Sequence, residues 1–158
     1  MKVVINLPKD KVSECNVFAD KMIKAGKKGK RDNYLLGSLG EYAVGIYEKL
    51  PINFIVREGW GDNGADLPGI QVKTVSYNGL GNKQIKVKPY DRCLKNKTVK
   101  YIYLCYANIN EKNKDGSINV SIIGKVSVDN FKIKRRVSDE YGKPLYLLDE
   151  SNLDEKFL

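Results

Sequence analysis

The apolar run from Val99 to Ile109 constrains the fold more than any other segment of this sequence. Its residues, VKYIYLCYANI, are apolar at consecutive rather than alternate positions. A strand of this kind suits a sheet that is covered on both faces. We therefore expect a central strand here, with Cys105 as a small residue of the core.

Two segments before Pro51 repeat apolar residues at helical spacing. In the first helix, expected over residues 9–26, they are Val12, Cys15, Phe18, Ala19, Met22 and Ile23. In the second, expected over about residues 33–50, they are Leu35, Leu36, Leu39, Tyr42, Ala43, Ile46 and Leu50. Gly26 and the basic run after it end the first helix, and Pro51 ends the second.

After Pro51 the pattern changes to strands separated by turn-rich segments. The expected strands are 52–58, 70–77, a short solvent-facing strand at 83–88, the central strand, and 118–128 with a bulge or bend at Gly124. A helical turn is expected within 89–97. This order predicts an α/β fold, a single domain with a central mixed β-sheet flanked by helices.

A length of 158 residues fits one domain over 1–158. We place its core at about 33–130, preceded by a basic helical segment at 9–32 and followed by an acidic tail at 149–158. No apolar run is long enough to cross a bilayer, and the first ten residues make a poor signal peptide. We therefore expect a cytoplasmic protein with no membrane partner.

The residue types that are missing exclude several chemistries. The chain has no histidine, so a Ser-His-Asp triad and a histidine-ligated zinc site are excluded. Its three cysteines are odd in number and widely spaced, which argues against a disulfide framework. Any catalysis must therefore use carboxylates, amides, lysines or hydroxyls.

The net charge of +9 is concentrated in parts of the chain. Lys21 to Arg31 holds six basic residues and no acid, and Lys83 to Lys100 holds seven against the single Asp91. Segregated positive charge favours a nucleic-acid partner, because binding phosphates releases condensed counterions. The candidate phosphate-binding residues are Lys27, Lys28, Lys30, Arg31, Lys83, Lys86 and Lys88.

The segment from Gly64 to Thr74, GADLPGIQVKT, carries the candidate chemistry. Alternation along a strand places Ile70 and Val72 on one face, and Gln71 and Lys73 on the other. Asp66 precedes a tight Pro-Gly turn and can therefore lie beside Gln71 and Lys73. A more ordinary interpretation is that Asp66 begins the turn, and that Gln71 and Lys73 form the solvated face of an edge strand.

These residue types suit phosphodiester hydrolysis. The side-chain oxygens of Asp66 and Gln71, with a backbone carbonyl such as that of Val72, are ligands that Mg²⁺ or Mn²⁺ accepts. A bound metal polarises a phosphate and makes water easier to deprotonate. Lys73 is then placed to orient that water or to stabilise developing negative charge.

The pattern Asp66-x₄-Gln71-x-Lys73 resembles the signature of the PD-(D/E)XK, or restriction-endonuclease-like, nucleases. The resemblance covers about residues 35–128 and implies a metal-dependent endonuclease that cleaves DNA or, less often, RNA. Such proteins carry a glutamate on the helix before the first core strand, and GSLGEYA makes Glu41 that candidate. Gln71 stands where the family usually has an acid, so we expect one tightly bound metal. The small chain would suit a phage or mobile-element nuclease of low sequence specificity, with a homodimer as one possible state.

Other functions stay open at this point. The chain could be a nuclease-fold protein that binds nucleic acid without cleaving it, a toxin-like RNA nuclease of the same fold, or a protein that binds an acidic partner. Trp60 and Tyr77 are candidates for base stacking. Glu58 and Asp62 are spare candidate ligands.

Overall fold

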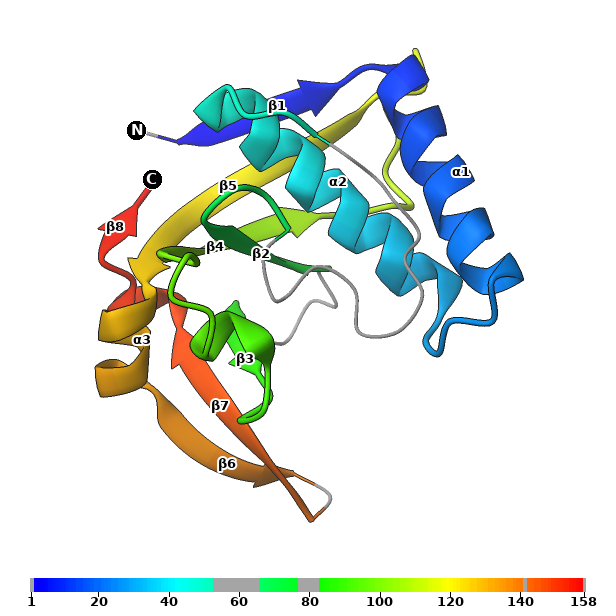
Figure 1. Cartoon of the computed structure of the whole chain (residues 1–158). Coiled ribbons are helices and arrows are strands. Elements are labelled where there is room, and N and C mark those ends of the chain that lie inside the picture. Colours follow the sequence, from blue (N-terminus) through cyan, green and yellow to red (C-terminus); the bar gives the residue numbers. More distant parts are fainter. Residues whose placement is uncertain (1, 53–65, 77–82, 141, 158) are drawn as a thin grey trace.

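The structure is a computed structural model, and it describes residues 2–52, 66–76, 83–140 and 142–157 (Figure 1). Helices and strands both contribute to the fold, as the sequence predicts. In chain order the described elements are β1 (Val3–Leu7), α1 (Lys9–Lys24), α2 (Arg31–Glu48), β2 (Ile70–Val75), β3 (Gln84–Val87), η1 (Arg92–Leu94), β4 (Tyr101–Ala107), β5 (Ile118–Ser127), α3 (Val128–Lys134), β6 (Arg136–Glu140), β7 (Lys143–Asp149), η2 (Glu150–Asn152) and β8 (Glu155–Lys156).

The larger sheet of the described residues has the strand order β1-β5-β4-β2, and β8 pairs with β5 beside this path. β2 and β4 are parallel, whereas the other pairs are antiparallel. The sheet is therefore mixed, as expected. β4 lies between β5 and β2, and its residues from Ile102 to Cys105 are buried. This confirms that the apolar run is a central strand covered on both faces.

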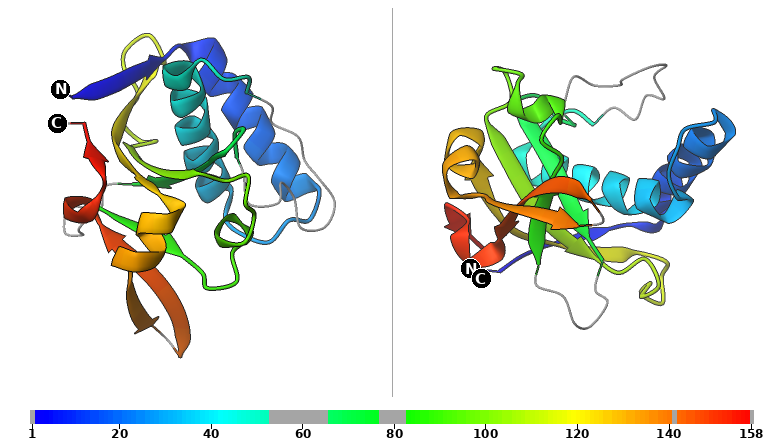
Figure 2. Two further views of the ribbon diagram at one scale, coloured as in Figure 1. Left: turned by 60° about the vertical axis from the view of Figure 1, so that its left-hand side comes forward. Right: turned by 90° about the horizontal axis from the view of Figure 1, so that it is seen from below.

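α1 and α2 pack together on one face of this sheet (Figures 1 and 2). Buried residues of both helices, among them Cys15 and Leu39, form one core cluster with Val72 of β2 and Cys105 of β4. Gly40 brings α2 close to the sheet, because a Cβ there would lie 1.8 Å from the Thr74 side-chain oxygen.

A second sheet, with strand order β3-β7-β6, covers the other face together with η1 and α3. The expectation of one central sheet is thus incomplete. β3 was also expected to face solvent, but its Ile85 and Val87 are fully buried, and β3 pairs with β7. The alternation along β3 places these two residues in a separate core cluster that includes Phe131 of α3 and Leu148 of β7.

The two ends of the chain belong to the larger sheet. β1 pairs with Ile118–Ile122 of β5, and β8 pairs with Gly124 and Lys125 of the same strand. The ends of the chain consequently lie close together (Figure 2). The sequence interpretation did not predict β1, and it treated 149–158 only as an acidic tail.

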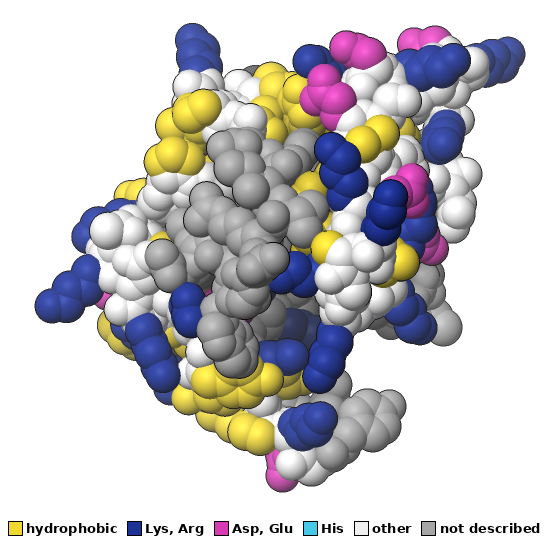
Figure 3. Space-filling view, turned by 45° about the vertical axis from the view of Figure 1, so that its right-hand side comes forward, with side chains coloured by type: hydrophobic (Ala, Val, Ile, Leu, Met, Phe, Trp, Pro, Cys, Tyr) yellow, Lys and Arg dark blue, Asp and Glu magenta, His cyan; other side chains and the backbone are white. Residues whose placement is uncertain are grey.

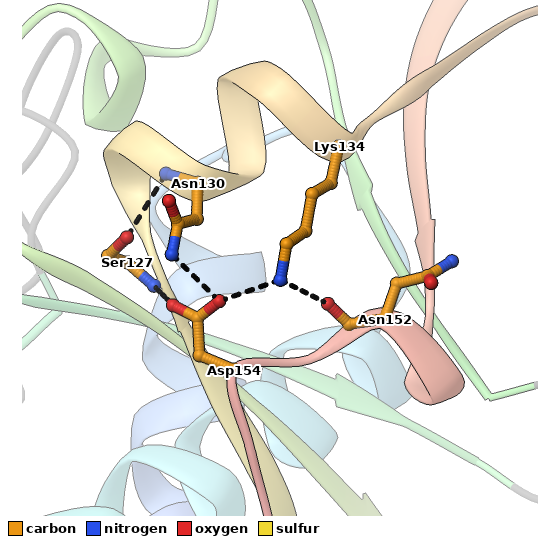
Figure 4. A network of polar contacts seen from close by, with 5 residues as sticks. All are labelled: Ser127, Asn130, Lys134, Asn152 and Asp154. Carbon is orange, nitrogen blue, oxygen red and sulfur yellow. Dashed lines mark hydrogen bonds and ion pairs between the residues drawn. The ribbon is translucent and has the colours of Figure 1, made fainter.

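A carboxylate in that tail attaches it to α3 (Figure 4). Asp154 accepts hydrogen bonds from Ser127 N–H (2.8 Å) and Asn130 Nδ2 (2.9 Å), and its Oδ1 lies 3.0 Å from Lys134 Nζ. Lys134 also donates to the carbonyl of Asn152 at 3.4 Å. The tail is therefore docked on the fold.

Most predicted elements are present within one to three residues of their expected ends. β4 and β5 change register between Leu104 and Cys105, opposite Gly124, as the expected bulge requires. Ile23 and Ile46, however, were assigned to the apolar stripes of the helices and are exposed. The predicted strand 52–58 lies almost entirely outside the described residues.

Candidate active site

A tight Pro-Gly turn leads into β2 and fixes the position of Asp66. Ile70 N–H donates to the Leu67 carbonyl at 2.9 Å, and Asp66 N–H donates to the Ile70 carbonyl at 2.9 Å. Gly69 has a φ of +75°, a conformation that glycine adopts without steric cost. The turn reverses the chain so that Asp66 lies beside the first residues of β2.

The Asp66 carboxylate is held against the backbone of β2. Its Oδ2 accepts a hydrogen bond of 2.7 Å from the backbone N–H of Val72. The N–H and C=O groups of one strand residue point in the same direction. The Val72 carbonyl therefore points to the side of β2 on which Asp66 lies, away from β4. The Asp66 carboxylate and the Val72 carbonyl are therefore on the same side of β2.

The two faces of β2 contact different layers. Ile70 and Val72 belong to the core cluster with α1 and α2, whereas Val75, which points the other way, packs on the cluster beneath the second sheet. Gln71 and Lys73 share the direction of Val75 by strand alternation. This face is not open to solvent, as an ordinary edge strand would be, because Gln71 is only 8% exposed.

The Gln71 side chain has an unsatisfied acceptor. Among the described residues, no donor lies within hydrogen-bond distance of its buried Oε1 atom. A buried polar atom without a partner costs about 1–3 kcal/mol, so most proteins avoid one. An unpaired buried amide oxygen is a feature that a bound cation or donor would satisfy.

Lys73 forms an ion pair that the sequence did not predict. Its Nζ lies 3.5 Å from Oδ2 of Asp91, and both side chains are about three-quarters buried. Asp91 also caps η1, because its Oδ1 accepts from Cys93 N–H at 3.0 Å. The only signal in the sequence was that Asp91 is the single acid within the basic stretch from Lys83 to Lys100.

The Cys93 thiol reports how the charged groups are arranged. Burial raises its pKa to about 12, and the negative charge of Asp91 adds to this effect. Lys73 acts in the opposite direction, and Asp66 again raises the pKa. The charges of Asp66, Lys73 and Asp91 therefore all act on one buried thiol.

Glu41 lies elsewhere. Burial raises the pKa of the Cys15 thiol on α1 to about 11, and the charges of Glu14 and Glu41 contribute. Cys15 belongs to the core cluster on the helical face of the sheet, opposite to Cys93. The charge of the half-buried Glu41 thus acts on the helical face of the sheet. Gln71 and Lys73 lie on the other face of β2.

Carboxylates are sparse at this site. Within the described ranges, no group of three or more His, Cys, Asp or Glu side chains converges as a metal cluster. Among the described residues, Asp66 bonds the backbone of β2 and Asp91 pairs with its Lys73. Glu58 and Asp62, the spare candidate ligands, and Trp60 and Tyr77, the candidate stacking residues, lie outside the described residues.

The predicted phosphate-binding residues lie on two separate segments. Lys27, Lys28 and Lys30 are in the connection between α1 and α2, whereas Lys83, Lys86 and Lys88 lie on or beside β3. Arg31 is already engaged, since its Nε lies 2.5 Å from Asp20 Oδ1 and its Nη2 donates to Asn16. Figure 3 shows Lys and Arg side chains scattered over one face of the molecule, with hydrophobic and acidic side chains between them.

Comparison with known proteins found no matching family model, no similar curated protein and no similar solved structure. In the described parts of the chain, no helix combines the length and apolar character needed to cross a bilayer.

Proposed function

We propose that this chain is a metal-dependent nuclease with a restriction-endonuclease-like core, most simply a DNA endonuclease of low sequence specificity. The observation that carries the proposal is the buried, unpaired Oε1 of Gln71. It belongs to the same short segment as Asp66 and shares a strand face with Lys73. A nuclease needs a metal ligand set and a nearby cation, and this segment supplies candidates for both.

The residues fit a hard cation such as Mg²⁺ or Mn²⁺. The candidate ligands are the Asp66 carboxylate, the Gln71 amide oxygen and the Val72 carbonyl, all of them oxygens. Gln71 brings no charge, so this set carries less negative charge than an all-carboxylate site, which supports one metal rather than two. Glu41 is left out of the proposed ligand set because its charge acts on Cys15, on the helical face of the sheet.

When bound, the metal would polarise a phosphodiester and lower the pKa of a coordinated water. The remaining work falls to the protein. The Val72 N–H bond holds the Asp66 carboxylate in one orientation. The Lys73 ammonium, kept in place by Asp91, can donate to a phosphate oxygen or to the attacking water. Burial of Gln71 keeps bulk water from its oxygen and so strengthens these electrostatic contacts.

A binding protein without catalysis is the second candidate. The Lys73–Asp91 ion pair favours it, because a lysine already paired with a carboxylate is less available to a substrate. The uncharged amide of Gln71 also favours a binding protein, because it brings no negative charge to a metal. An RNA nuclease of the same fold differs from the main proposal only in its substrate.

The test is a cleavage assay with single-stranded DNA, duplex DNA and structured RNA, each with Mg²⁺, Mn²⁺ or EDTA. The Lys73→Ala and Asp66→Asn variants are compared with Lys112→Ala, which changes an exposed loop lysine. We expect metal-dependent cleavage that both site variants abolish and the control retains. Absence of cleavage by the folded wild type on every substrate would reject the nuclease and leave the binding protein.

A further inference from the structure

A pocket of about 250 Å³ lies beside the candidate active site, between η1 and α3. One wall is the segment that follows η1, and the other is the start of α3, which packs against η1 (Figure 1). The charged residues that line it are Lys95, Lys97, Lys100, Lys132 and Asp129. None of these four lysines is among the phosphate-binding residues predicted from the sequence.

The lysines of this pocket are not neutralised. Among the described residues, none of the four forms an ion pair with a carboxylate. The loop that carries three of them is nevertheless ordered by its own hydrogen bonds. Asn96 Oδ1 accepts from both the N–H and the hydroxyl of Thr98, at 3.0 and 2.8 Å. Like charges held in one hollow repel each other, and a bound anion would offset that repulsion.

The floor of the pocket is apolar. Leu94, Val99 and Val128 line it, and all three are buried. A cationic rim above an apolar floor suits an anion that also carries an apolar body. A nucleotide has both parts, since its phosphate can meet the lysines while its sugar or base contacts the small apolar area that these residues expose. Inorganic phosphate would use the rim alone.

The pocket is joined to the candidate active site by backbone hydrogen bonds. Lys100 N–H donates to the carbonyl of Gly69, in the turn before Gln71, at 2.8 Å. Leu94 N–H donates to the carbonyl of Asp91, the partner of Lys73, at 3.2 Å. We propose that this pocket binds a nucleotide unit of the substrate strand next to the phosphodiester that reaches Lys73. This ligand class rests on the proposed function.

The test measures binding of a fluorescent oligothymidylate by anisotropy, in EDTA and at several salt concentrations. The double variant Lys100→Gln/Lys132→Gln removes one lysine from each wall. Its control, Lys112→Gln/Lys114→Gln, removes the same charge from an exposed loop outside the pocket. We expect the pocket variant to weaken binding by at least about tenfold and to reduce the salt slope by about 1.4, with little change in the control.

Equal weakening in the two double variants would overturn the proposal, because the effect would then be one of overall charge. A variant with the opposite expectation is Asp129→Asn, which removes the acid of the pocket and should tighten binding about twofold to fivefold. Unchanged or weaker binding by folded Asp129→Asn would also count against the pocket.

Two further ligands test whether the pocket binds a nucleic-acid strand, a mononucleotide or free phosphate. Thymidine 5′-monophosphate and inorganic phosphate are titrated as competitors. If both compete only weakly with the labelled oligothymidylate, the pocket binds a nucleic-acid strand. If either competes as strongly as unlabelled oligothymidylate does, the strand assignment is overturned. The binding assay contains EDTA and therefore does not depend on cleavage. A failure of the nuclease proposal appears in the cleavage assay, whereas a failure of the pocket proposal appears in the binding assay. Pocket-dependent binding by a protein that cleaves nothing would support the pocket alone.

Discussion

The Lys73 ammonium lies 3.5 Å from the Asp91 carboxylate, and this ion pair links β2 to the turn that begins η1. Both side chains are about three-quarters buried, so the pair is less screened than one on the open surface. The ion pair thereby connects β2, which carries Gln71, to η1, which lines the pocket between η1 and α3. The orientation of Lys73 should depend on Asp91.

Asp91→Asn tests that dependence. The amide oxygen can still accept from Cys93 N–H, so the cap of η1 is kept while the charge beside Lys73 is lost. We expect oligonucleotide binding to tighten about twofold to fivefold, because a nearby negative charge is removed. Metal-dependent cleavage should slow at least about tenfold, because Lys73 loses the group that orients it. Cleavage at the wild-type rate would show that Asp91 does not position Lys73.

Gln71 offers a test of metal binding that does not depend on activity. Gln71→Leu removes the unpaired buried acceptor, so we expect unchanged or higher stability in EDTA and no gain on adding Mg²⁺. Gln71→Glu buries a carboxylate and should lose about 1–3 kcal/mol in EDTA. That variant should regain stability with Mg²⁺, since a ligand that binds only the folded state stabilises it. Thermal unfolding with Mg²⁺ or EDTA measures both variants, and an equal Mg²⁺ response in wild type and Gln71→Leu would contradict the ligand role.

Gly40 and Gly37 lie in the same helix and should respond oppositely to alanine. A Cβ at Gly40 would meet Thr74 Oγ1 at 1.8 Å, so α2 would have to move away from β2. We expect Gly40→Ala to cost about 1–3 kcal/mol in the free energy of unfolding. At Gly37 no atom of the described residues outside the helix backbone lies within 4 Å of the added Cβ, so Gly37→Ala should gain up to about 1 kcal/mol. Urea unfolding measures both changes. A neutral Gly40→Ala would mean that the helix approaches the sheet less closely.

The sequence predicted the elements whose patterns are long and regular. The helices α1 and α2 and the strands β2, β4 and β5 follow directly from apolar spacing, whereas α3 was not predicted. β1 and β7 were missed because each lies next to charged residues, so its strand pattern is hard to separate from a loop. The second sheet depends on pairing between β3 and β7, and such long-range pairing leaves no local signal.

In the candidate site, too, local patterns were predicted from the sequence and long-range contacts were not. Asp66, Gln71 and Lys73 come from one short segment, so strand alternation and the Pro-Gly turn were sufficient to group them. Asp91 joins them from a distant turn, and only the fold brings its carboxylate to Lys73. The place of Glu41 could not be derived in this way, because a helical wheel separates the two faces of α2 but does not tell which layer each face meets.

Asp154 should make the stability of the protein depend on pH. Burial acts to raise the pKa of its carboxyl, but hydrogen bonds from Ser127 N–H, Lys134 and Asn130 outweigh this and hold the pKa below its ordinary value of 3.8. A carboxyl whose pKa is lower in the folded state contributes stability above its unfolded pKa, and that contribution is lost as the pH falls through the folded value.

We therefore expect Asp154→Asn to cost about 1 kcal/mol near neutral pH, because three donors lose a charged acceptor at a partly exposed site. The difference from wild type should stay constant down to about pH 5 and shrink as the pH falls below 4. Asp139→Asn is the control, since Asp139 is exposed on β6 and has no partner among the described residues. Urea unfolding across this pH range decides the matter. A difference that persists unchanged at acidic pH would mean that Asp154 docks the tail through the geometry of its side chain rather than through its charge.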